Sequence, residues 1–163
     1  MGIDIAELAA RAAIEDALLT YCRGVDRLDA DLVRAAFHDD AVLLDYGPEP
    51  LHIDAFVTHV IARLGERFTA TQLRVSHTRI ERTGSTAKVE AYVRAFHVES
   101  GDDGRFLHTF NGRYIDTAED RGQGWRIAQR ILRVDWSRRD PWHEDMSGSW
   151  PQSGRDRSDP VYQ

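Results

Sequence analysis

The chain has 163 residues, which is enough for one domain with a sizeable hydrophobic core. Acidic residues outnumber basic ones by 27 to 21, and this balance disfavours a nucleic-acid binder, because such proteins usually carry a basic face. Cys22 is the single cysteine, so no internal disulfide can form and we expect a cytoplasmic protein. No apolar run approaches the ~20 residues of a membrane-spanning helix, and the acidic N-terminus is unlike a signal peptide.

The first third of the chain has the apolar spacing of helices. Residues 4–25 predict a long helix, and residues 31–37 predict a short one with an aspartate available to cap its start. An apolar run at 41–46 is typical of a buried strand, and residues 53–68 predict a third helix.

The rest of the chain is rich in β-formers separated by short turns such as GDDG and RGQG. Helices followed by an antiparallel meander indicate an α+β fold with the helices on one face of a curved sheet. The predicted strands cover residues 73–82, 86–100, 106–120 and 125–136. Residues 141–163 contain several prolines and tryptophans, and we expect an extended tail that packs on its own or a neighbouring subunit.

Three stretches resemble SnoaL-like proteins of the nuclear transport factor 2-like superfamily: RAAIEDALLTYCRGVDRLDADLVRAAFHDDAVL, NGRYIDTAEDRGQGWRIAQRILRVDW and the ending GRDRSDPVY. The resemblance covers nearly the whole chain. It implies that residues 1–140 form a cone, in which a strongly curved mixed sheet is wrapped by three N-terminal helices around one pocket. The branch it resembles contains hexachlorocyclohexane dehydrochlorinase, scytalone dehydratase and bile acid 7α-dehydratase. These enzymes are cofactor-free lyases, and the resemblance implies a homo-oligomer, a trimer or a dimer.

Asp26 and Tyr21 are the first candidate catalytic residues, at the end of the first predicted helix in YCRGVDR. By itself, Asp26 is typical of a solvated helix end. The resemblance implies instead that Asp26 pairs with a histidine and acts as general base on a carbon-bound proton. Tyr21, about one and a half turns earlier, could donate a hydrogen bond to a leaving oxygen or a carbonyl, or could be an aromatic core residue.

The histidine of that pair is where the sequence departs from the family pattern. In TQLRVSHTRIE the usual histidine position falls on Leu73, and His77 takes the place of an asparagine. Alternation places His77 on the same strand face as Leu73, roughly 13 Å farther along. Either His77 is the base from a new position, or the standard pair is missing.

His97 is a second candidate base on the next predicted strand, where it shares a face with Ala95. His108 lies across the GDDG hairpin and could face the same side. None of these histidines has metal-site spacing such as H-x-H or H-E-x-x-H, so we expect no metal.

Arg130 matches the arginine that helps to bind the leaving group in the dehydrochlorinase-like pattern, five residues after Trp125. Alternation groups Arg130 with Arg126 and Ala128 but does not say which face is inside. Arg113 and Arg133 are alternatives, and a solvated or interfacial ion pair is an equal possibility.

Together these residues predict a cofactor-independent, dehydratase-like lyase that acts on a hydrophobic small molecule such as a steroid, a polyketide or an aromatic compound. An isomerase or cyclase would use the same pocket, and a non-catalytic binding or assembly domain is a further alternative. We expect no cofactor, no nucleic acid and no membrane partner. The expected pocket wall comprises Leu44, Tyr46, Phe56, Val60, Leu64, Leu73, Val75, Phe96, His108 and Phe110.

Overall fold

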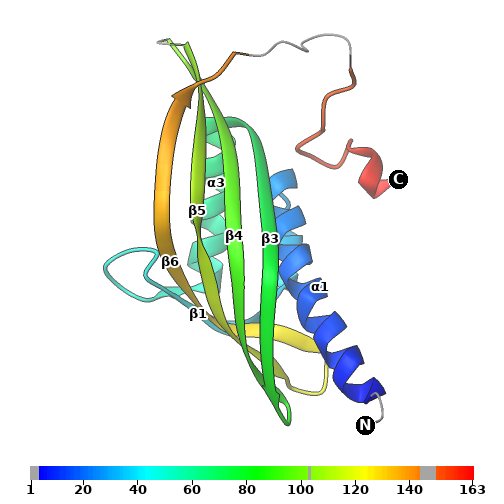
Figure 1. Cartoon of the computed structure of the whole chain (residues 1–163). Coiled ribbons are helices and arrows are strands. Elements are labelled where there is room, and N and C mark those ends of the chain that lie inside the picture. Colours follow the sequence, from blue (N-terminus) through cyan, green and yellow to red (C-terminus); the bar gives the residue numbers. More distant parts are fainter. Residues whose placement is uncertain (1–3, 103, 144–149) are drawn as a thin grey trace.

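The computed structural model describes residues 4–102, 104–143 and 150–163. Three helices lie against the concave side of a long curved sheet, and the C-terminal segment lies beside the helices (Figure 1). The helices are α1 (Ile5–Arg27), α2 (Ala30–Ala35) and α3 (Ile53–Arg67), with a short 3-10 helix at Pro160–Tyr162. The strands are β1 (Phe37–Leu44), β2 (Leu51–His52), β3 (Phe68–Thr83), β4 (Thr86–Gly101), β5 (Gly104–Asp120) and β6 (Trp125–Pro141).

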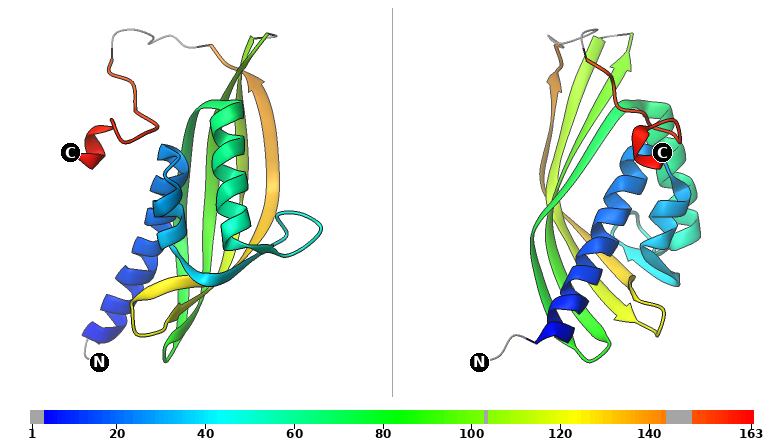
Figure 2. Two further views of the ribbon diagram at one scale, coloured as in Figure 1. Left: turned by 180° about the vertical axis from the view of Figure 1, so that it is seen from behind. Right: turned by 90° about the vertical axis from the view of Figure 1, so that its right-hand side faces the viewer.

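The six strands form one sheet in the order β2-β1-β6-β5-β4-β3. The β1–β6 pair is parallel and the other pairs are antiparallel, so the sheet is mixed. Its long strands bend around the helices without closing into a barrel (Figure 2). The predicted α+β cone, with three helices and a strongly curved mixed sheet, is confirmed.

Local capping explains where the first helices begin and end. Asp4 caps α1, because its carboxylate accepts hydrogen bonds from the backbone amides of the first turn. Leu28 ends α1 in a left-handed conformation, and Asp29 caps α2 by accepting the Leu32 amide at 3.1 Å. A Cβ atom at Gly24 would lie 2.6 Å from the backbone nitrogen of Val33 in α2, so only glycine permits the two helices to approach this closely.

The sheet is longer than the sequence predicts at its upper end in Figure 1, where β3 begins, the β4–β5 hairpin turns and β6 ends. β3 begins at Phe68 instead of 73, and β6 runs to Pro141 instead of 136. The added residues are mostly polar or charged, so they lack the apolar alternation that marks a half-buried strand. Backbone pairing with β4 and β5 holds them in the sheet.

A bulge in β3 moves His77 to the face opposite to the predicted one. The pairing of β3 with β4 shifts between Ser76 and Arg79, and His77 has a φ of 50°. Its ring is exposed and packs against Tyr92 on the outer face, with ring centroids 5.9 Å apart. The expectation that His77 shares the face of Leu73 is therefore wrong.

A second irregularity interrupts the predicted alternation in β6. Asp116 and Thr117 pair with Arg130 and Gln129, but Ala118 pairs with Ile127, so Ala128 is an extra residue. Ile127 and Arg130 consequently both point inward, and each is almost fully buried.

The described part of the tail packs on its own chain. Arg155 donates hydrogen bonds to the backbone carbonyls of Leu64 and Phe68, where α3 passes into β3. The Tyr162 hydroxyl donates to Asp29 at 2.8 Å. Part of the predicted tail, residues 144–149, lies outside the described residues. No helix in the described ranges is long and apolar enough to cross a membrane.

Candidate functional site

A cavity of about 580 Å³ lies between the helices and the concave face of the sheet. Its inner wall is mainly apolar and includes Val25, Leu64, Phe68, Leu73, Phe110 and Leu132. Two phenols, Tyr21 and Tyr114, and two imidazoles, His97 and His108, interrupt this wall, and exposed arginines stand around it. Such a mixture suits a largely apolar ligand with a few polar groups.

His97 and His108 face each other on β4 and β5, because the hairpin register pairs these two residues directly. The ring of Phe68 packs against both imidazoles, at centroid distances of 4.7 and 5.5 Å. Burial lowers the pKa of His97 to about 4, and the nearby charge of His108 and of arginines acts in the same direction. His97 is therefore neutral at neutral pH.

Glu99 binds His108 through a 2.7 Å hydrogen bond between Oε2 and Nε2. The same carboxylate accepts from Arg67 at 2.9 Å and from Arg139 at 3.3 Å. These donors, Arg67 first and His108 second, hold the pKa of Glu99 at about 2, so it is ionised. An ionised acceptor at Nε2 favours the tautomer in which Nε2 carries the hydrogen and Nδ1 is free to accept a proton.

Asp26 is not paired with a histidine. Both of its carboxylate oxygens accept the backbone amide of Leu73, at 3.0 and 3.1 Å. Burial raises the pKa of Asp26 to about 6, and the Leu73 amide partly opposes that shift. The residue lines a separate, more polar hollow of about 660 Å³ together with Thr71 and Arg155. Among the described residues, no histidine forms a hydrogen bond with Asp26, because the family's histidine position is a leucine that offers only its backbone.

Arg130 lies behind the cavity wall, where it is completely buried. Its Nε and Nη2 atoms donate to the two oxygens of Asp116, at 2.9 and 2.7 Å. The guanidinium also lies against the rings of Tyr21 and Tyr114, 4.4 and 3.9 Å from their centroids. The expectation that Arg130 faces the ligand is not met, because its charge is already paired and covered by aromatic rings.

Tyr21 and Tyr114 separate this buried ion pair from the cavity. Burial raises the pKa of both phenols, and the adjacent Arg130 charge opposes the shift. Both phenols therefore stay protonated at neutral pH and can donate a hydrogen bond. Tyr21 is thus a core aromatic that also lines the cavity, and its role as a donor to a ligand stays a prediction.

Half of the predicted pocket wall lines the cavity: Val60, Leu64, Leu73, His108 and Phe110. Tyr46, Phe56 and Val75 pack in or against the adjoining core instead.

The other two predicted wall residues, Phe96 and Leu44, also lie outside the cavity wall. Phe96 lies on the outer face of β4 beneath the guanidinium of Arg74, 5.5 Å from the ring centroid, because it alternates with the inward Ala95. Leu44 is only half-buried, and the preceding Leu43 occupies the fully buried position on β1.

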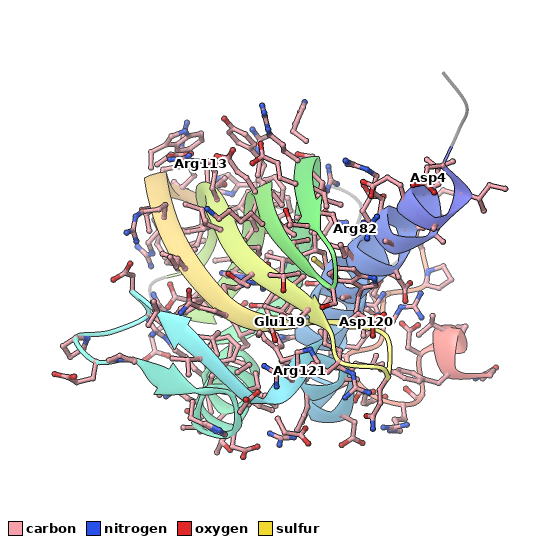
Figure 3. All side chains as sticks on the ribbon, turned by 90° about the horizontal axis from the view of Figure 1, so that it is seen from below. Asp4, Arg82, Arg113, Glu119, Asp120 and Arg121 are labelled. Carbon is pink, nitrogen blue, oxygen red and sulfur yellow. The ribbon has the colours of Figure 1, made fainter. Side chains whose placement is uncertain are left out.

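The alternative arginines also lie outside the cavity. Arg113 stands on the convex side of the sheet (Figure 3) and pairs with Glu90 at 2.8 Å. Arg133 pairs with Asp45, and both of these side chains are about half exposed. Arg113 and Arg133 are therefore no better placed than Arg130 to contact a molecule in the cavity.

Sequence reasoning missed Glu99 and the arginines beside it. The hairpin symmetry that pairs His97 with His108 also places Glu99 diagonally next to His108, on the same face. On α3, Arg63 and Arg67 are four residues apart and so share a face. Within the described residues, no group of three or more His, Cys, Asp and Glu side chains could hold a metal ion.

Residues 6–131 match the family model described as SnoaL-like domain. The fold is also shared with solved structures. A type-2 hexachlorocyclohexane dehydrochlorinase, LinA, has a TM-score of 0.78 at 18% identity, covering 90% of this chain and 99% of that one. A type-3 LinA from Novosphingobium barchaimii has a TM-score of 0.71 at 18% identity, with coverages of 87% and 99%.

A protein of Novosphingobium aromaticivorans, provisionally named a scytalone dehydratase, has a TM-score of 0.70 at 22% identity. The alignment covers 85% of this chain and 91% of that chain. Among curated proteins, none matches the sequence. At these identities, the likeness to the solved structures concerns the fold.

Proposed function

Since the chain belongs to the SnoaL-like domain family, we propose that it is a cofactor-independent lyase that removes a proton from a hydrophobic small molecule bound in the 580 Å³ cavity. The observation that carries this proposal is the 2.7 Å hydrogen bond that Glu99 makes to His108, a residue in the wall of a largely apolar cavity. A carboxylate-bound imidazole is a common form of general base.

In the proposed reaction, Nδ1 of His108 takes a proton from a carbon atom of the ligand. The electrons of the broken C–H bond form the new double bond, and the leaving group departs from the neighbouring carbon with the electrons of its own bond. The ionised Glu99 stabilises the imidazolium that results. Neutral His97 adds no opposing charge beside it.

Tyr21 and Tyr114 line the same cavity, and their phenols are the proposed hydrogen-bond donors. A protonated phenol can donate to a departing oxygen or to an oxyanion that develops on the ligand. The buried Arg130 lies against both rings and helps to hold them in place. Elimination is favoured over isomerisation because the matching folds include proteins named as a dehydrochlorinase and a scytalone dehydratase.

A non-catalytic ligand-binding domain is the second candidate, and one specific observation favours it. Leu73 occupies the position of the family's histidine, and its backbone amide holds Asp26. If Glu99 and His108 do not replace the standard pair, the cavity binds its ligand without chemistry.

Proton abstraction can be tested without knowledge of the natural substrate. The protein would be incubated in D2O with cyclic ketones, cyclic β-hydroxyketones and chlorinated cyclohexanes. Mass spectrometry would then follow deuterium uptake and the loss of water or chloride. We expect turnover of at least one of these classes, and a loss of roughly 10²- to 10⁴-fold in the His108→Gln variant.

The His77→Gln variant is the matched control, because its imidazole lies on the outer face. Activity that survives in His108→Gln but not in Asp26→Asn would overturn the assignment of the base. Ligands that bind to the protein but neither exchange protons nor lose a leaving group would favour the binding domain.

A further inference from the structure

Four arginines contribute to the wall of the cavity, Arg63 and Arg67 from α3 and Arg138 and Arg139 from the end of β6. No aspartate or glutamate is among the described residues that line it. Both pairs stand at the upper end of the cone in Figure 1, where α3 passes into β3 and where β6 ends. The exposed part of the cavity is therefore basic, although the whole chain has a net charge of −6.

Ion pairs within the described part of the chain engage three of these four arginines and leave Arg63 without one. Glu99 is shared by Arg67 and Arg139, and Asp140 pairs with Arg138. Among the described residues, Arg63 has no ion pair and no hydrogen bond from its guanidinium. The four arginines thus form ion pairs with only two carboxylates, and Glu99 also binds His108.

The charges of Arg63 and Arg67 also act on His97, which lines the cavity. The pKa of His97 is lowered first by burial and then by the charges of His108, Arg155, Arg67 and Arg63. Two of those arginines line the same cavity. An imidazole deep enough to be desolvated therefore still lies within the field of these arginines, which would favour an anion placed at the same depth or nearer to the opening.

We propose that the ligand of this cavity is an amphipathic organic acid. Its apolar ring or chain lies inside the cavity, and its carboxylate is held by Arg63 together with the other arginines that line the cavity. The planar guanidinium donates two parallel hydrogen bonds to a carboxylate, which favours this group over a neutral hydroxyl. The inference rests on the proposed function only in taking this cavity as the ligand site. It narrows the substrate class from hydrophobic molecules in general to hydrophobic carboxylates.

The test compares the binding of three probes of similar size: 2-naphthoate, the neutral 2-naphthalenemethanol and 2-naphthyl phosphate. Affinities would be measured by calorimetry at pH 7.5 and low salt, so that catalysis plays no part in the result. We expect naphthoate to bind at least tenfold more tightly than the alcohol. Arg63→Gln should weaken naphthoate binding by about tenfold, typical of one lost charge-assisted interaction, and leave alcohol binding unchanged.

Arg79→Gln is the matched control, because it removes the same charge from an exposed arginine on β3 that pairs with Glu81 and does not line the cavity. It should leave all three affinities unchanged. Equal binding of naphthoate and alcohol, or an Arg63→Gln variant like the wild type, would overturn the inference while the cavity remains a ligand site. A clear preference for the phosphate would overturn the choice of a carboxylate. Failure of every probe to bind would contradict the cavity as a ligand site and with it the proposed function.

Discussion

Two charged clusters built from similar groups occupy opposite parts of the cone, and their surroundings give them different roles. Behind the cavity, Arg130 and Asp116 form a two-point ion pair in which neither side chain is exposed. At the upper end, Glu99 binds His108, Arg67 and Arg139 at similar distances, but the His108 and Glu99 side chains remain about one fifth exposed. The two clusters differ in solvent access more than in the type of pair, and this difference separates the enclosed ion pair from the cluster that we propose to be reactive.

Because the Arg130–Asp116 pair is fully buried, it matters for the stability of the fold and is closed to a ligand. Burial raises the pKa of Asp116, and only the adjacent guanidinium opposes that shift. One guanidinium nitrogen, Nη1, has no hydrogen-bond partner in the described part of the chain. The faces of Tyr21 and Tyr114 cover the cation instead. Removal of one partner would leave a desolvated charge that water cannot reach.

The largest expected effect follows from breaking this pair. Asp116→Ala should lower the free energy of unfolding by about 3–5 kcal/mol, because Arg130 would remain buried and unpaired. Urea denaturation followed by circular dichroism would measure the loss. Replacing both partners, as Asp116→Leu with Arg130→Met, should restore much of the stability.

Glu99→Ala is the contrasting variant at the open end of the cone. It removes a carboxylate that solvent can partly replace, so we expect a much smaller change in stability but a marked loss of proton abstraction. A Glu99→Ala variant as unstable as Asp116→Ala would show that the two clusters play the same structural role.

Asp26 lies between these extremes, since it is partly buried and held by a backbone amide instead of a direct ion pair. Its pKa is about 6 in the folded state and about 3.9 in an unfolded chain. The native state therefore binds the proton more tightly, and this residue makes the free energy of unfolding fall as pH rises from about 4 to about 6. The size of that fall is at most about 3 kcal/mol.

Asp26→Asn removes this titration, so its stability relative to the wild type should improve between pH 4 and pH 7. Urea denaturation of both proteins at unit steps of pH would measure the difference. If the difference in stability between the two proteins stays constant over this range, Asp26 is not desolvated in the folded protein. Its carboxylate would then behave like one exposed to solvent.

The smallest effect is expected at His77, the histidine that alternation assigned to the pocket. His77→Ala removes an exposed ring that packs on Tyr92, so stability should change by no more than about 0.5 kcal/mol. Ligand affinity in the cavity should not change. Calorimetric binding of 2-naphthoate to this variant would check both the placement of His77 and the position of the β3 bulge. Weaker binding would place His77 in the cavity after all.

Much of the architecture could be predicted because it depends on local, repeated patterns. The apolar spacing of residues 4–25 is visible along one helix, and α1 covers nearly the same range. The GDDG turn sets the register of its hairpin, so the facing of His97 and His108 follows from counting outward from the turn. Asp26 was also correctly placed at the end of α1, although its partner is the Leu73 amide and not a histidine.

The candidate site was harder to predict because its geometry depends on single departures from regularity. One extra residue near His77 and another at Ala128 reverse which face the following side chains occupy. Neither bulge has a glycine or proline to mark it in the sequence. A strand assigned by perfect alternation therefore sends His77 inward and puts Ile127 and Arg130, which both point inward, on opposite faces.

The amino-acid sequence by itself thus determined the order of the helices and strands, the curved α+β sheet and the family, since these follow from periodicity and turn chemistry spread over many residues. Only the tertiary structure decided which charged groups meet where solvent reaches them and which are enclosed. Glu99 and His108, or Arg130 and Asp116, meet across strands and owe their roles to how much water reaches them. Solvent access is a property of the packed molecule, so it cannot be predicted from the spacing of residues along the chain.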